Sequence, residues 1–149
     1  MKAKELGHVV FYVRSLERSL AFYHDLLGFS IVGEAFGGKA AALTSGRTHH
    51  EMLLIEVGED ATPIPQGRRI GLYHIGIKVG DSMDELRDAH RELVEAGVRI
   101  VGTSDHTVTQ SIYCLDPDGN EVEVFTEADP ALWKDNPDAV MAPIKPLRL

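Results

Sequence analysis

The sequence predicts an α+β fold in which two tandem βαβββ modules form a curved mixed sheet around a metal-binding cup. Three observations predict it: one order of strand, helix and three strands occurs twice, the two halves share letters, and a histidine opens each half. A single module leaves one face of its sheet unburied, whereas two copies can enclose a shared cavity. With 149 residues, 44% of them hydrophobic, the whole chain is expected to form one domain.

The first module is expected over about residues 6–58. Residues 8–13 predict a strand, and residues 15–27 predict a helix with Ser15 as its N-cap and Gly28 after its last turn. Three more strands follow; they are expected at residues 28–33, 40–44 and 52–57. Prolines and glycines at about residues 59–70 then indicate a linker between the modules.

The second module is expected over about residues 71–127. Residues 74–79 predict its first strand, and Ser82 and Glu85 have the spacing of a capping box at the start of a helix that stops at Gly97. The remaining strands are expected at residues 97–102, 111–115 and 121–125. The last segment, about residues 128–149, contains four prolines and is expected to be an irregular tail with one helical turn near residues 131–134.

Polar side chains on the predicted strands suggest a metal site. Because side chains alternate across a strand, His74 lies on the face opposite the apolar residues of its strand, as do Glu121 and Glu123 on theirs. His8 opens the equivalent strand of the first module. Two imidazoles and one carboxylate can hold a divalent metal and leave positions open for substrate. The alternation does not choose between the two glutamates; Glu123 lies deeper in the sheet and is preferred. Any single such histidine is more often structural.

Composition excludes some functions. A net charge of −8, with 15 basic residues spread along the chain, argues against a nucleic-acid-binding surface. The single cysteine, Cys114, cannot form an internal disulfide and fits a reducing compartment. Residues 1–6 show no secretory signal, and no stretch approaches the roughly 20 apolar residues of a membrane span. A cytoplasmic protein without membrane or nucleic-acid partners is therefore expected.

Residues 116–123, Asp-Pro-Asp-Gly-Asn-Glu-Val-Glu, are similar to the DPDGNxxE element of the vicinal-oxygen-chelate superfamily. That superfamily includes glyoxalase I, fosfomycin- and bleomycin-resistance proteins, methylmalonyl-CoA epimerase and extradiol dioxygenases. The resemblance covers roughly residues 6–127 and implies paired βαβββ modules around a metal, with ligands at His8, His74 and Glu123. It selects Glu123 over Glu121 by analogy, and modules of this kind often form homodimers or larger homo-oligomers.

Two further stretches resemble the type I extradiol (catechol 2,3-) dioxygenases of this superfamily. Residues 46–50 are similar to their His-His element, whose second histidine is an acid–base group beside the metal, and residues 105–113 are similar to a stretch whose His and Tyr contact the bound catecholate. The resemblance therefore implies catalytic roles for His50, His106 and Tyr113. It implies Fe(II), although Mn(II), Zn(II) or Ni(II) can use such ligands, with an aromatic diol and O₂ as substrates. Without the resemblance, these side chains are equally typical of a hairpin cap, a turn and a strand aromatic.

Two other functions compete with ring cleavage. Glu56 follows His8 by 48 residues and Glu123 follows His74 by 49, so Glu56 could be a fourth ligand in a glyoxalase-like lyase or isomerase with a His₂Glu₂ site for Ni(II), Zn(II) or Co(II). Along an ideal strand, however, His50 and Glu56 lie about 20 Å apart, so only one of them can be central, and His50 is preferred. The second competitor is a metal-free resistance protein that binds an aromatic antibiotic; a stoichiometric metal analysis would separate it from both enzymes.

Overall fold

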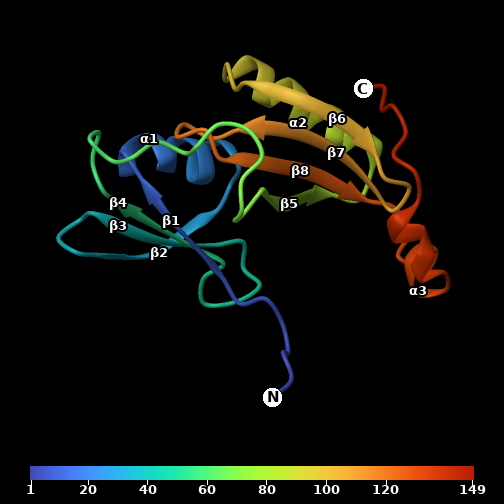
Figure 1. Ribbon diagram of the computed structural model, residues 1–149, viewed down its shortest axis with the longest axis horizontal. Coiled ribbons are helices and arrows are strands. Elements are labelled where there is room, and N and C mark those ends of the chain that lie inside the picture. Colours follow the sequence, from blue (N-terminus) through green and yellow to red (C-terminus); the bar gives the residue numbers. More distant parts are fainter. The chain divides into compact units, whose positions relative to one another are not determined.

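Two four-stranded mixed sheets with the same strand order form the framework of the protein (Figure 1). The computed structural model describes residues 1–149. The chain forms two compact units, Met1–Pro65 and Gln66–Leu149. Unit one contains β1 (Val9–Val13), β2 (Ser30–Ala35), β3 (Ala40–Thr44) and β4 (Met52–Glu56), ordered β1-β4-β3-β2. Unit two contains β5 (His74–Gly80), β6 (Ile100–Asp105), β7 (Thr109–Leu115) and β8 (Glu121–Glu127), ordered β5-β8-β7-β6. The expected α+β fold with two βαβββ modules is confirmed.

In unit one, the predicted helix begins where expected but is not a regular α-helix throughout. Ser15 caps it, since its side-chain oxygen accepts a hydrogen bond from the Arg18 backbone N–H, and α1 spans Leu16–Leu20. The chain then widens into the π-helix η1 (Ala21–Leu26), where the Leu27 N–H donates to the Phe22 carbonyl, five residues back. Phe22 and its neighbour Tyr23 are both buried in this wider turn, which a regular helical face does not predict.

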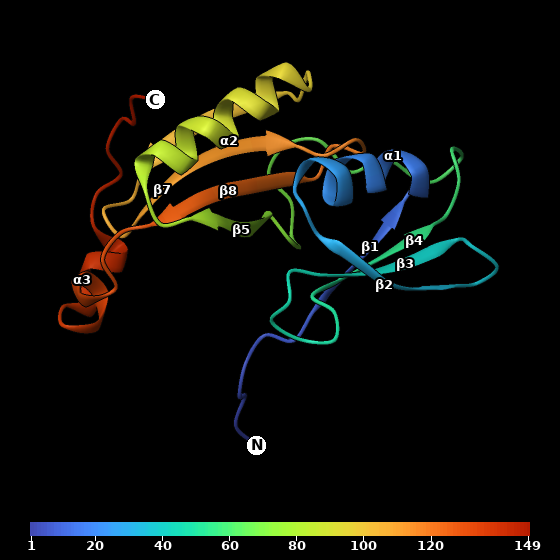
Figure 2. The ribbon, with the colours of Figure 1, turned by 180° about the vertical axis from the view of Figure 1, so that it is seen from behind.

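In unit two, the predicted capping box forms. The Ser82 side chain accepts from the Glu85 N–H, and the Glu85 carboxylate accepts from the Asp81 N–H and the Ser82 hydroxyl. The resulting helix α2 (Met83–Glu95) lies across one face of the sheet (Figure 2). Buried apolar side chains fill the space between helix and sheet: Leu86, Leu93, Ile112, Cys114, Val122 and Val124. The alternate residues of β8 are therefore left on the sheet's other face.

The strands β2 and β6 begin two to three residues later than the sequence predicts. Gly28 and Gly97 have positive φ angles of 80° and 71° and end the two helices, as expected for a C′ glycine. The next residues are still bonded to the helices, because the Phe29 N–H donates to Tyr23 and the Val98 N–H donates to Leu93. Because Phe29 and Val98 are still hydrogen-bonded to the helices, the two strands begin only after them.

The final segment returns to the sheet of unit two. The expected helical turn is α3 (Ala131–Lys134), which is followed by the 3₁₀ helix η2 (Pro137–Met141). Backbone hydrogen bonds between Asp105 and Lys145, in both directions, then attach the segment to the end of β6. None of the helices has the length and apolar character that crossing a bilayer requires.

Candidate metal centre

The turn before β8 positions the candidate carboxylate ligand. The buried Asp116 carboxylate accepts hydrogen bonds from the backbone N–H groups of Asp118 (3.0 Å) and Asn120 (2.8 Å) and from the Asn120 side-chain amide (2.8 Å). Gly119 supplies the positive φ, 88°, that the turn requires. The turn delivers β8 to β5 in a fixed parallel register, with Glu121 opposite His74 and Glu123 opposite Gly76.

His74 and Glu123 meet on the sheet face opposite α2. The Nε2 atom of His74 lies 3.3 Å from Oε2 of Glu123, and both side chains are mostly buried. Gly76 leaves room mainly for the Phe125 ring, since a Cβ added there would lie 3.2 Å from that ring and at an ordinary contact distance of 3.5 Å from the same Glu123 oxygen. Two of the three expected metal ligands therefore come together within unit two.

Glu121, which the sequence suggests only as an alternative to Glu123, also approaches His74. Its Oε1 lies 3.6 Å from Nδ1 of His74, a buried nitrogen with no hydrogen-bond partner in the structure. The Tyr73 hydroxyl donates a hydrogen bond to Glu121, which raises the pKa of Tyr73, and the Tyr73 and His74 ring centroids are 4.8 Å apart. Strand pairing, rather than any sequence motif, brings Glu121 to the second nitrogen of His74.

Tyr113 and His106 form a hydrogen-bonded chain that ends on Glu123. The Tyr113 hydroxyl donates to Oε1 of Glu123 over 3.0 Å, and Nε2 of His106 lies 2.7 Å from the same hydroxyl. Because the hydroxyl hydrogen is used on Glu123, His106 is placed to donate to the phenol oxygen. Burial, followed by the nearby Glu123 charge, raises the pKa of Tyr113 far above its ordinary value. The two residues expected to contact substrate thus lie beside a candidate ligand.

In unit one, His8 lies beside His50. Their ring centroids are 4.6 Å apart, and His49 completes a group of three imidazoles, with its Nδ1 2.6 Å from Nδ1 of His50. Partial burial, followed by the neighbouring His49 and His8, lowers the pKa of His50. Glu51 holds the preceding loop by accepting from the Ser45 and Arg47 backbone N–H groups. His8 and His50, the expected ligand and the expected acid–base group, therefore lie together in this unit.

Glu56 does not occupy the position expected for a fourth ligand. Met52 pairs with Val9 in unit one as Val122 pairs with Ile75 in unit two, so Leu53 is the counterpart of Glu123. Glu56 lies on the helix side, where its carboxylate accepts a hydrogen bond from the Leu16 backbone N–H over 2.9 Å. Counting residues from the histidines had suggested the opposite, because the helical segment and the β2–β3 hairpin of unit one are shorter than α2 and the β6–β7 hairpin of unit two. The proposed His₂Glu₂ set therefore lacks its fourth member.

The donor set of unit two fits part of a divalent metal site. Two ligands with bonds of about 2.1 Å at right angles lie about 3 Å apart, close to the observed 3.3 Å between His74 Nε2 and Glu123 Oε2. The second nitrogen of His74 is free for a carboxylate, as is usual for metal-bound histidines. In the structure no three His, Cys, Asp or Glu side chains converge as a metal cluster. His8 belongs to unit one, whereas His74 and Glu123 belong to unit two.

Two proteins of known activity are similar to this chain in sequence. It is 34% identical over 129 residues to the catechol-2,3-dioxygenase of Bacillus subtilis (strain 168), an alignment that covers 87% of this chain and 44% of that protein. It is 28% identical to the metallothiol transferase FosB of Lysinibacillus sphaericus (strain C3-41), covering 85% of this chain and 84% of the transferase. The chain spans between 44% and 61% of the length of the dioxygenases it matches.

Solved structures show the same fold. A glyoxylase/bleomycin resistance protein/dioxygenase domain from Frankia sp. EAN1pec superposes with a TM-score of 0.68 at 22% sequence identity, covering 85% of this chain and 99% of that one. Residues 5–124 match the family described as the Glyoxalase/Bleomycin resistance protein/Dioxygenase superfamily. The chain therefore belongs to the glyoxalase/bleomycin resistance protein/dioxygenase superfamily.

Proposed function

We propose that this protein is a metal-dependent oxygenase of the extradiol type, which cleaves the ring of a catechol-like aromatic diol with O₂. The observation that carries the proposal is the continuous group His74, Glu123, Tyr113 and His106 in unit two. It combines two metal-ligand types with two hydrogen-bonding groups of the kind that binds a phenolate. The similarity to a catechol-2,3-dioxygenase, at 34% identity, supports the same chemistry.

The metal ligands in this proposal are His8, His74 and Glu123. Two imidazoles and one carboxylate suit Fe(II), and Mn(II), Zn(II) or Ni(II) can use the same atoms. When bound, Fe(II) would supply the Lewis acidity and the redox capacity that reaction of a diol with O₂ requires. Glu121 is placed to accept the Nδ1–H of His74 and so to keep Nε2 available as the ligating atom. Tyr113 holds the Glu123 carboxylate in one orientation.

The remaining histidines would move protons and stabilise charge. His50 has a lowered pKa and is therefore mostly neutral at pH 7, so it can accept a proton from the diol hydroxyl and return it later. His106 can donate a hydrogen bond to an oxyanion that develops on the substrate. Tyr113, whose raised pKa keeps it protonated, can act as a second donor only by turning its single O–H from Glu123 to the substrate. We expect the protein to act as a homodimer or larger homo-oligomer in the cytoplasm.

Two other activities remain as alternatives to ring cleavage. A glyoxalase-like lyase or isomerase would need another fourth ligand, since Glu56 accepts its hydrogen bond at the start of α1. A thiol-transfer activity draws support from the metallothiol transferase relative, 84% of which the chain spans. A metal-free antibiotic-binding protein would not require the His74–Glu123 pair, whose side chains are of metal-ligand types.

The test is anaerobic reconstitution with Fe(II), followed by oxygen uptake with a panel of catechols and by absorbance of the yellow ring-opened product. We expect uptake of one O₂ per diol and one tightly held metal per chain. His74→Ala should abolish metal retention, whereas His90→Ala, on α2, should retain it. Stoichiometric metal with no oxygen uptake, but with thiol transfer or isomerisation, would reject the oxygenase in favour of those alternatives. Absence of bound metal after reconstitution would reject all the metal-dependent proposals together.

A further inference from the structure

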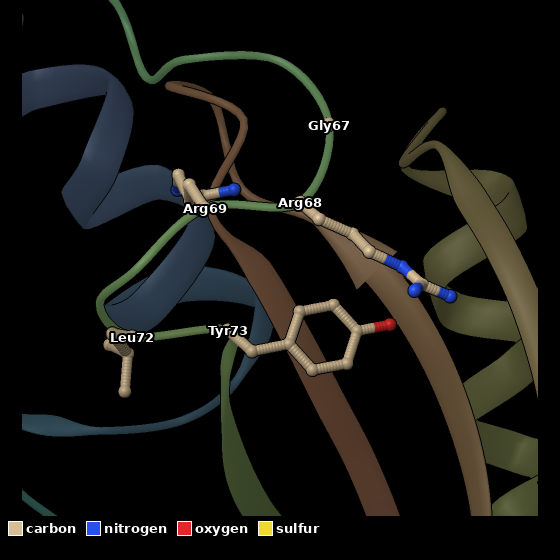
Figure 3. A pocket seen from close by; sticks show the side chains of 5 residues that line it. All are labelled: Gly67, Arg68, Arg69, Leu72 and Tyr73. Atoms are coloured by element: carbon tan, nitrogen blue, oxygen red, sulfur yellow. The ribbon is translucent and has the colours of Figure 1, made fainter.

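A hollow of about 640 Å³ opens beside the candidate ligand His74. It is lined by Gly67, Arg68, Arg69, Leu72 and Tyr73, all from the segment of unit two that leads into β5 (Figure 3). Its volume is within the usual range for a small-molecule site. Leu72 and Tyr73 are 54% and 68% exposed, so an apolar and aromatic surface is open to a ligand.

Two cations line this hollow and make no ion pair in the structure. Salt bridges hold Arg18, Arg47, Arg87 and Arg91, whereas Arg68 and Arg69 take part in none. Glu121 interacts with the lining residue Tyr73, whose hydroxyl donates to it, and its carboxylate faces His74. The hollow therefore carries an excess of positive charge in a protein whose net charge is −8.

The hollow adjoins the candidate metal ligand through Tyr73. The ring of Tyr73 lines the hollow, and its centroid lies 4.8 Å from that of His74. Figure 3 shows the Arg68 side chain and the Tyr73 hydroxyl extending to the same side of the segment. An aromatic ring stacked on Tyr73 would thus lie beside His74 and within reach of a guanidinium. Guanidinium groups bind carboxylates through paired, charge-assisted hydrogen bonds.

We propose that this hollow binds the acidic side group of the substrate, so that the preferred substrate is an aromatic diol that carries a carboxylate. The inference deepens the proposed function and rests on it for the chemistry at the diol. Leu72 and Tyr73 hold the ring, and Arg68 and Arg69 select the acid. A neutral diol lacks the group that the two guanidiniums recognise.

The test begins with binding, which needs no turnover. Calorimetric titration of the metal-free protein compares 3,4-dihydroxyphenylacetate with neutral 4-methylcatechol. The variants are Arg68→Gln, Arg69→Gln and the double variant, with Arg91→Gln on α2 as a control that removes the same charge far from the hollow in sequence. We expect tighter binding of the acid, a loss of about tenfold for each single variant and no effect in the control. Added salt should weaken binding of the acidic diol and leave binding of the neutral diol unchanged.

Turnover separates this inference from the proposed function. If the reconstituted enzyme cleaves both diols, the acid should show the higher kcat/KM, and the double variant should remove that preference mainly through KM. Equal affinities for the acidic and the neutral diol, or an equal loss in Arg91→Gln, would refute the proposal that the hollow binds a carboxylate. Neither result would affect the proposed ring cleavage. Arginine-dependent binding of the acid without cleavage of either diol would reject the proposed function and retain the hollow as an aromatic-acid site.

Discussion

Replacing Glu121 by glutamine tests how His74 is held for metal binding. The change keeps the size of the side chain and removes the charge that lies 3.6 Å from Nδ1 of His74. It also weakens the hydrogen bond from Tyr73. Nε2 of His74 and the Glu123 carboxylate are left as they are. We therefore expect a weaker metal site with an intact fold.

The distance sets the size of the effect. Unit charges 3.6 Å apart interact by about 4.6 kcal/mol at an effective dielectric constant of 20 and by about 1.2 kcal/mol in water. The Nδ1–H of His74 carries less than a unit charge, which favours the lower part of this range even though the two side chains are mostly buried, at 28% and 20% exposed. A loss of about 1.4–2.8 kcal/mol corresponds to metal binding about 10- to 100-fold weaker.

The assay is competition for Co(II) or Zn(II) with a chelator of known affinity, supported by the visible absorption of bound Co(II). Glu95→Gln, at the exposed end of α2, removes an equal charge and should bind metal like the unaltered protein. Circular dichroism confirms that each variant is folded. A change of less than about threefold for Glu121→Gln would show that Glu121 does not orient His74. An equal loss in Glu95→Gln would assign the effect to overall charge.

Three other predictions address the acid–base group, the core and the cysteine. His50→Phe should keep the metal and slow turnover by about 10²- to 10⁴-fold in an oxygen-uptake assay, whereas normal turnover would disprove the acid–base role. Leu54→Ala, at a fully buried position of β4, should lower the free energy of unfolding by about 2–5 kcal/mol in a urea titration, and a smaller loss would mean that the core of unit one closes around the gap. Burial, with Asp116 and Glu121 nearby, raises the pKa of Cys114 to about 11. The native protein should therefore be inert to a thiol reagent at pH 8 and reactive when unfolded; the associated stability is present below about pH 9 and lost as the pH rises toward 11. Rapid native labelling would contradict this burial.

Local features of the chain were predicted well. Ser15 and Ser82 are N-caps, Gly28 and Gly97 end their helices, and residues 40–44 form a strand with the predicted bounds. Each of these follows from the preferences of a few adjacent residues. The π-helical turn at Ala21–Leu26 was not predicted, because it depends on how two neighbouring aromatic side chains pack against the sheet.

The candidate site shows the same division. Alternation along β5 and β8 correctly placed His74 and Glu123 on one face, where Nε2 of His74 and Oε2 of Glu123 lie 3.3 Å apart. The equivalence of Glu56 with Glu123 was wrong, because counting residues cannot detect that the helical segment and the first hairpin of unit one are shorter than their counterparts. The role of Glu121 beside His74 also escaped the sequence argument, since it arises from pairing between strands 47 residues apart.

The sequence by itself determined the duplicated βαβββ order, the ends of the helices and the sheet faces of the candidate ligands. These features depend on the spacing of apolar residues, on helix-capping residues and on turn residues, each of which acts over a few adjacent positions. Only the tertiary structure decided that Glu56 bonds to the start of α1, that Tyr113 joins His106 to Glu123, and that two arginines line a hollow beside His74. The register between strands distant in the chain sets such contacts, and that register depends on the packing of the whole sheet.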